Sequence, residues 1–172
     1  MFPRSWLLVD EMLSEGRSKD EIIAKLNDKF LIPQDEILDN FTNCIDQIRM
    51  REEKCDIRIS DFILKHYRER PMFFDIGHPT DIVMKEMWRQ VCDIIGVEAE
   101  LEADVNGRMD EYEDPILPCV TYALRLQYDR SRIRESVWNW RLKEYMDLNE
   151  YVEEYIWWKN KSRHGRLLKE MI

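Results

Sequence analysis

The amino-acid sequence predicts a helix-rich α/β fold in which helices flank a small, partly parallel β-sheet. Several segments repeat apolar residues at spacings of three and four, the period of a helix that packs one face on a core. One short apolar run, Met72–Ile76, is followed by a tight loop and then by the start of a helix. That order is typical of a strand in an open α/β sheet, where loops at the carboxyl ends of the strands carry the chemistry.

The N-terminal third of the chain is predicted to form three helices. The first ends at Gly16, and the second begins with a capping box in which Ser18 and Glu21 each bond the other's backbone N–H group. The third helix starts at Pro33, a residue that fits the first turn of a helix. Its apolar stripe consists of Ile37, Leu38, Phe41, Cys44, Ile45 and Ile48.

The middle of the chain is predicted to hold the central strand of the sheet. Pro71 ends a short helix, and Met72–Ile76 then forms the buried strand. Thr80 or Asp81 caps the next helix, which Gly96 terminates. The sheet is therefore expected to lie between this helix and the helices that begin at Pro33 and near residue 147.

The C-terminal part is predicted to contain an acidic loop, a short helix and a long helix. Residues 97–115 are rich in Asp and Glu, which favours a solvated loop over a cation site. A second capping box, Asp147–Glu150, opens the final helix. We expect residues 1–158 to form one domain and residues 159–172, which are rich in Lys and Arg, to form a basic tail.

Charge and composition exclude several classes of function. The 26 basic and 35 acidic residues give a net charge of −9, a field that repels nucleic acids and anionic membranes. No apolar run approaches the ~18 residues of a membrane span. The four cysteines show no C-x-x-C pair and no metal-ligand spacing, which predicts no metal site and is consistent with a reducing cytoplasm.

His78 is the candidate catalytic base. Gly77 and Pro79 on either side of it give the loop one permissive and one rigid backbone position. A helix beginning at Thr80 would direct unpaired N–H groups toward the same region, which favours a phosphate or an oxyanion. Asp75 is placed to orient the imidazole. The alternative is that Asp75 and Thr80 only bond the loop while His78 closes the sheet edge.

Arg51 is a secondary candidate, for binding a phosphate group. It follows a helix, precedes a turn, and carries the planar guanidinium that matches phosphate geometry. The alternative is that Arg51 and Glu52 form an exposed charge pair with little effect on stability.

The loop motif resembles a known superfamily. Asp75-Ile76-Gly77-His78-Pro79-Thr80 is similar to the final sequence block of the SGNH hydrolases and acyltransferases, where Asp-x-x-His supplies the acid and the base of a triad. A narrower likeness, over most of residues 5–158, is to the C-terminal part of the WcbI-type polysaccharide-biosynthesis enzymes. The segments that carry it, in order, are Arg51-Glu52, Cys55–Ile63, Phe73–Thr80, Asp114–Pro118 and Leu148–Ile156.

This resemblance implies an incomplete SGNH-like fold and an acetyltransferase of capsule assembly. The donor would be acetyl-coenzyme A and the acceptor a hydroxyl of a sugar or polysaccharide precursor. His78 would be the base and Asp75 its orienting group, and Gly77, Thr80 and Arg51 would contact coenzyme A.

The chain departs from the family pattern at the nucleophile. The Gly-Asn-Cys segment with which those enzymes begin is missing, and Asn43-Cys44 lies on a helical stripe without the glycine turn. The chain is therefore interpreted as a fragment or as a shortened relative that transfers the acyl group directly. The alternatives are a non-catalytic helical module that binds a partner segment, enzyme or ligand, and a hydrolase that removes acetyl groups.

Overall fold

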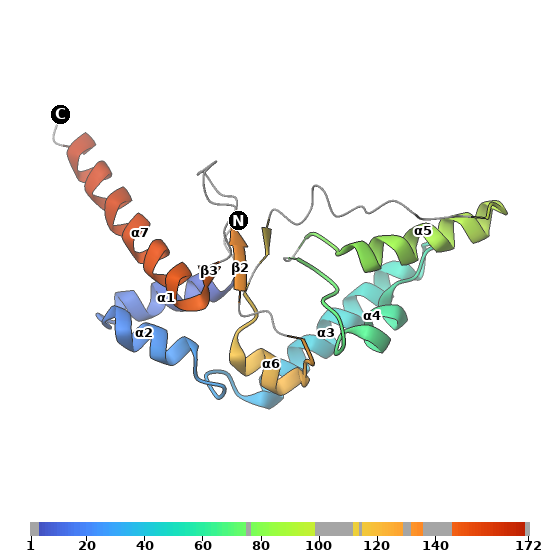
Figure 1. Ribbon diagram of the computed structural model, residues 1–172, viewed down its shortest axis with the longest axis horizontal. Helices are drawn as coiled ribbons and strands as arrows, with labels where there is room; N and C mark the ends of the chain where they lie inside the picture. Colours follow the sequence, from blue (N-terminus) through green and yellow to red (C-terminus); the bar gives the residue numbers. More distant parts are fainter. Residues whose placement is uncertain are drawn as a thin grey trace.

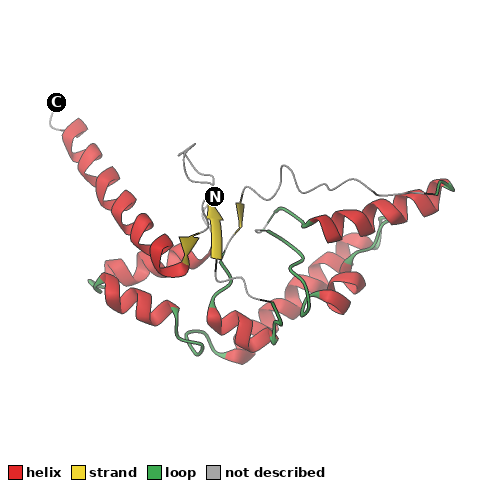
Figure 2. Cartoon of the chain, in the orientation of Figure 1, coloured by secondary structure: helices red, strands yellow, loops and turns green. Residues whose placement is uncertain are grey.

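The computed structural model describes residues 4–74, 77–98, 112–113, 115–128, 132–135 and 146–170. Most of these residues are helical (Figure 2). The helices are α1 (Arg4–Ser14), α2 (Lys19–Leu26), α3 (Gln34–Glu52), α4 (Ser60–His66), α5 (Asp81–Ile95), α6 (Pro118–Leu124) and α7 (Leu148–Glu170). The strands are β1 (Tyr112–Glu113), β2 (Arg132–Glu135) and β3 (Met146–Asp147).

Helix α3 connects two groups of helices. It packs against α6 near its amino end and against α4 near its carboxyl end. In Figure 1, α6 lies against the beginning of α3, α1, α2 and α7 form a group on the left, and α4 and α5 lie toward the other end of α3. Because one helix serves both groups, its apolar stripe is divided between two hydrophobic cores, which we call the first and second core.

The first core joins the two ends of the described chain. Val9 of α1, Ile22 of α2 and Val152 of α7 are each at most 2% exposed there. Several polar contacts also hold α7 to α1 and α2. Tyr155 Oη donates to Asp10 at 2.7 Å, Lys159 pairs with the same carboxylate, and Lys19 Nζ lies 2.5 Å from a Glu153 oxygen. The buried members of this core are Val9, Met12, Ile22, Leu26, Ile37, Leu117, Cys119, Ala123, Leu148, Tyr151, Val152 and Tyr155.

The second core is smaller and lies under the loop that carries His78. Its buried members are Ile45, Ile63, Met72 and Val83. They come from α3, α4, the segment after Pro71, and α5, so this core fixes where the loop and the start of α5 sit relative to α3.

The predicted parallel sheet is wrong. The three described strands form an antiparallel sheet in the order β1-β2-β3. Met72–Phe74, predicted to begin the central strand, instead folds back on the residues that follow it: Phe73 forms an isolated antiparallel bridge with Pro79, and Phe74 N donates to His78 O at 2.8 Å. The pairing is local, so no neighbouring strand is needed. Asp75 and Ile76, the rest of the predicted strand, lie outside the described residues.

The predicted helix starts are largely confirmed. Ser18 and Glu21 form both bonds of the capping box. Asp147 accepts from the backbone N–H of Glu150 at 2.9 Å, and the Glu150 side chain accepts from Asp147 N. Helix α7 continues to Glu170 through the stretch expected to be a tail. Among the described helices, none combines the length and the apolar character that a bilayer crossing requires.

Candidate functional site

The candidate site is the loop between Pro71 and α5. Two backbone hydrogen bonds cross it, from Phe74 N to His78 O at 2.8 Å and from Thr80 N to Met72 O at 2.9 Å. Thr80 is only 2% exposed. Its hydroxyl donates to Pro71 O at 2.9 Å and lies 3.2 Å from Met72 O. These contacts close the loop at its base and set the direction in which α5 begins.

His78 and the neighbouring Gly77 are both exposed, near the closed base of this loop. The loop thus presents the His78 side chain to solvent on a backbone held by hydrogen bonds. Asp75 lies outside the described residues, so its role as the orienting carboxylate stays a prediction.

The amino end of α5 lacks a side-chain cap, because the Thr80 hydroxyl is turned back toward the preceding segment. The first N–H groups of a helix have no partner within the helix and carry a partial positive charge. The end of α5 next to His78 therefore suits a phosphate or a developing oxyanion. Thr80 itself has both its hydroxyl and its N–H group engaged, so it supports this end of the helix by position.

Glu52 has a role that the sequence did not reveal. It is only 8% exposed, and its carboxylate accepts from Ile59 N at 2.5 Å, from Ser60 N at 2.9 Å and from Ser60 Oγ at 2.5 Å. Helix α4 has no local side-chain cap, so the last residue of α3 caps it instead. Glu52 is therefore not part of an exposed charge pair, whereas Arg51 beside it is exposed.

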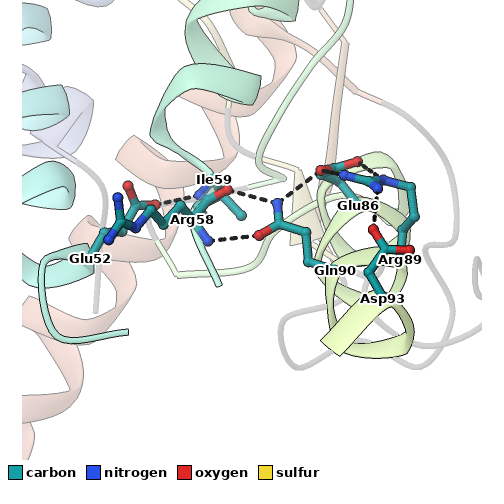
Figure 3. Close-up of polar contacts among 7 residues, drawn as sticks. All are labelled: Glu52, Arg58, Ile59, Glu86, Arg89, Gln90 and Asp93. Atoms are coloured by element: carbon teal, nitrogen blue, oxygen red, sulfur yellow. Dashed lines mark hydrogen bonds and ion pairs between the residues drawn. The ribbon is translucent and has the colours of Figure 1, made fainter. Parts of the chain in front are cut away.

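A second polar cluster ties the segment before α4 to α5 (Figure 3). Gln90 accepts from Arg58 N and donates to Arg58 O, both at 2.8 Å, and also donates to Glu86 at 2.8 Å. Arg89 bonds Glu86 and Asp93, and its hydrogen bonds lower the pKa of the Glu86 carboxyl. With Glu52 at one side and Gln90 at the other, residues 58–60 are held to both α3 and α5.

An apolar groove of about 390 Å³ runs along α3 beside the His78 loop. The loop forms part of its wall, through Met72, Phe73 and Phe74. Cys44 also lines it, from the middle of α3, and is exposed. The remaining lining residues are Phe41, Ile45, Ile48, Ile63, Tyr67, Pro115, Ile116, Val120, Leu124, Leu126 and Tyr128.

The structure brings some of the predicted site residues together and leaves others apart. Gly77, His78 and Thr80 share one loop, and Arg51 lies on the last turn of α3, outside the groove lining. Cys44 sits in the interior of α3, without the glycine turn of a strand-end nucleophile. Within the described ranges, no three His, Cys, Asp or Glu side chains gather as a metal site would require.

Comparison with known structures shows that this chain is similar to a solved structure of WcbI, described as a novel polysaccharide biosynthesis enzyme. It is the native protein without a disulfide bond between coenzyme A and one of its cysteines. The TM-score is 0.68 at 18% sequence identity, a likeness of fold. The match covers 89% of this chain and 52% of the other, so the chain spans about half the length of that protein.

Comparison with sequences points to the same family. No curated protein sequence matches the chain. The sequence model of one family, described as polysaccharide biosynthesis enzyme WcbI, matches residues 4–100, which is more than half of the chain and includes the His78 loop and the start of α5. The chain therefore belongs to the WcbI family of polysaccharide biosynthesis enzymes.

Proposed function

We propose that the chain takes part in acyl transfer from a coenzyme A thioester to a hydroxyl group of a sugar, during synthesis of a surface polysaccharide. The observation that carries the proposal is the exposed His78 on a hydrogen-bonded loop beside the uncapped amino end of α5. The family supplies the polysaccharide context, and the WcbI structure supports coenzyme A as the carrier. Transfer of an acetyl group in particular, an SGNH-like ancestry and a role in capsule assembly are part of this proposal.

The proposed reaction needs no enzyme nucleophile. His78 takes the proton of the sugar hydroxyl as its oxygen attacks the thioester carbonyl, and the carbonyl oxygen becomes an oxyanion. The N–H groups at the start of α5 stabilise that oxyanion. The C–S bond then breaks, the thiolate of coenzyme A leaves, and the imidazolium returns the proton to it. A positioned base of this kind contributes about 10²–10⁴-fold to the rate.

The other predicted residues receive supporting roles. Asp75 orients the imidazole of His78, and Arg51, exposed on the last turn of α3, pairs with a phosphate of coenzyme A. Gly77 lets the substrate approach the loop backbone closely. Thr80 positions the amino end of α5, because its own polar groups are bonded within the loop.

The test is the release of free coenzyme A from acetyl-coenzyme A, measured with and without a panel of hexose and N-acetylhexosamine acceptors. We expect acceptor-dependent release that falls by about 10²–10⁴-fold in His78→Gln. His66→Gln is the control. His66 is another histidine, at the end of α4 and outside the His78 loop, so this variant should leave the rate unchanged. Equal rates for wild type and His78→Gln would remove His78 from the reaction.

A non-catalytic role is the second candidate, favoured by the observation that the chain spans about half of the WcbI structure. In that case the chain would bind a partner protein and not coenzyme A. A thermal-shift titration separates the two, because a ligand present at 100 times its dissociation constant stabilises the fold by ~2.7 kcal/mol. Absence of any shift with coenzyme A, together with a stable complex with a second protein, would favour the partner-binding role.

A further inference from the structure

We infer that the apolar groove beside the His78 loop binds the acyl chain of the coenzyme A thioester, and that it admits acyl groups longer than acetyl as well as acetyl itself. This inference rests on the proposed function and specifies its substrate class. Three features of the groove support it: the chemistry of its walls, the charges at one edge, and its contact with the loop.

The walls of the groove match a hydrocarbon chain. All of the residues that line it are uncharged, and the polar atoms that their side chains offer are the Cys44 thiol and the hydroxyls of Tyr67 and Tyr128. A sugar or a nucleotide needs several hydrogen-bonding partners, and burying its polar groups without them is unfavourable. The volume of about 390 Å³ lies within the roughly 300–1,000 Å³ of small-molecule sites.

One edge of the groove is basic although the chain as a whole carries a net charge of −9. Arg68 Nε donates to the hydroxyl of the lining residue Tyr67 at 2.9 Å, and the guanidinium carbon lies 5.4 Å from the centre of that ring. Arg125 lies between the lining residues Leu124 and Leu126. Because Gln127 N donates to Arg68 O at 2.7 Å, the two arginine-bearing segments are joined at this edge. Glu69 is the acidic residue next to Arg68.

This combination fits an amphiphile with an anionic head. An apolar chain would occupy the groove while the phosphates of coenzyme A meet the guanidinium groups at the edge, a pairing that arginine geometry favours. The wall that contains Phe73 and Phe74 belongs to the His78 loop, and Phe74 N is bonded to His78 O. A chain held in the groove would therefore bring its thioester close to the proposed base.

The experiment measures equilibrium dissociation constants, below the micelle concentration of each ligand, for coenzyme A and its acetyl, butyryl, octanoyl and dodecanoyl thioesters. We expect affinity to rise about three- to fourfold for each methylene that enters the groove, and then to level off when the groove is full. Equal affinity for acetyl- and dodecanoyl-coenzyme A would overturn the inference.

Two variants on α3 make the test specific. Cys44→Phe places a ring in the groove at an exposed position, so the fold tolerates it, and it should abolish the gain in affinity with chain length. Met50→Phe is the matched control, because Met50 is 62% exposed and lies outside the lining. It should retain the gain. A gain that survives in Cys44→Phe would show that the chains bind elsewhere.

Two further questions are tested in parallel: whether coenzyme A supplies the anionic head of the ligand, and whether binding of the acyl chain is independent of His78. Dodecanoate without coenzyme A should bind more weakly than dodecanoyl-coenzyme A, and Arg68→Gln should weaken all thioesters by a similar factor. Dodecanoate binding as tightly as the thioester would contradict coenzyme A as the carrier. The affinities of the same thioesters for His78→Gln should keep their dependence on chain length. If the rate assay removes His78 from the reaction, the binding of acyl chains in the groove can still be upheld by these affinities. If the affinities show no dependence on chain length, the role of His78 is still decided by the rate assay.

Discussion

Replacing Glu52 tests a structural feature that the sequence did not reveal, the capping of α4 by the last residue of α3. The carboxylate of Glu52 accepts two backbone N–H groups and one hydroxyl, from Ile59 and Ser60, at 2.5–2.9 Å. In Glu52→Ala both N–H groups lose their partner in a region where Glu52 is 8% and Ser60 4% exposed.

The expected loss can be worked from these contacts. A buried donor left without a partner costs about 1–3 kcal/mol, and loss of a helix cap costs about 0.5–2 kcal/mol. Because water reaches part of the site once the side chain is shortened, we expect a loss of about 2–4 kcal/mol in the free energy of unfolding. For a chain of this size that lowers the midpoint of thermal unfolding by roughly 5–15 °C.

The assay is equilibrium unfolding in urea, followed by circular dichroism, with Glu53→Ala as the control. Glu53 is the next residue in the sequence but is exposed, and its replacement should change stability by less than about 0.5 kcal/mol. Ser60→Ala and the double variant measure the coupling between Glu52 and Ser60 directly. A Glu52→Ala variant as stable as Glu53→Ala would refute the assignment of Glu52 as the cap.

Three further predictions concern stability elsewhere in the fold. Burial, and then the hydrogen bond to Asp10, raise the pKa of Tyr155 above its ordinary value of 10. The neutral hydroxyl therefore stabilises the fold fully below pH 10, and this contribution is lost as the pH rises further. The midpoint of thermal unfolding between pH 9 and 11 should fall steeply in wild type and less in Tyr155→Phe. Hydrogen bonds from Arg89 lower the pKa of Glu86. The contribution of the Glu86 carboxylate to stability is therefore present above pH 4.5 and is lost as the pH falls through the lowered pKa. Glu86→Gln should make the free energy of unfolding less sensitive to acid, and an unchanged pH profile would count against the pairing. Gly96 ends α5 in the left-handed conformation, at φ +71°, and an added Cβ would meet nothing within 4 Å. Gly96→Ala should therefore lower the free energy of unfolding in urea by about 1 kcal/mol, through backbone strain alone. An unchanged free energy would contradict the left-handed conformation.

The helices were predictable because their signals are local. The apolar stripe of α3 and the capping boxes at Ser18 and Asp147 each depend on residues a few positions apart. The structure confirms both capping boxes and places most of the stripe against the two cores, although Leu38 is 40% exposed. Cys92, on the buried face of α5, is 2% exposed. Cys44, on the stripe of α3, is exposed because it faces a groove that the described chain leaves open.

The sheet was not predictable from the same kind of signal. A short apolar run before a helix has the composition of a buried strand, but Met72 contributes to a helical core while Phe73 pairs with Pro79, six residues later. Sequence spacing does not distinguish pairing within a loop from pairing with a distant strand.

The supports of the candidate site were missed for a related reason. Glu52 caps a helix whose first residue comes eight positions later, and Gln90 bonds the backbone of Arg58 across 32 positions. Both contacts arise only when α3, α4 and α5 pack together. The position of His78 in a loop was predicted, since Gly77 and Pro79 mark the turn in the sequence itself.

The most direct test of His78 as the base is chemical rescue of His78→Ala by added imidazole. The side chain is exposed on its loop, so a small base can enter the space that the substitution leaves. The account predicts that imidazole restores acceptor-dependent release of coenzyme A in His78→Ala, in proportion to its concentration, and leaves the wild-type rate unchanged. A slow variant that imidazole does not rescue, or a variant as fast as wild type, would contradict it.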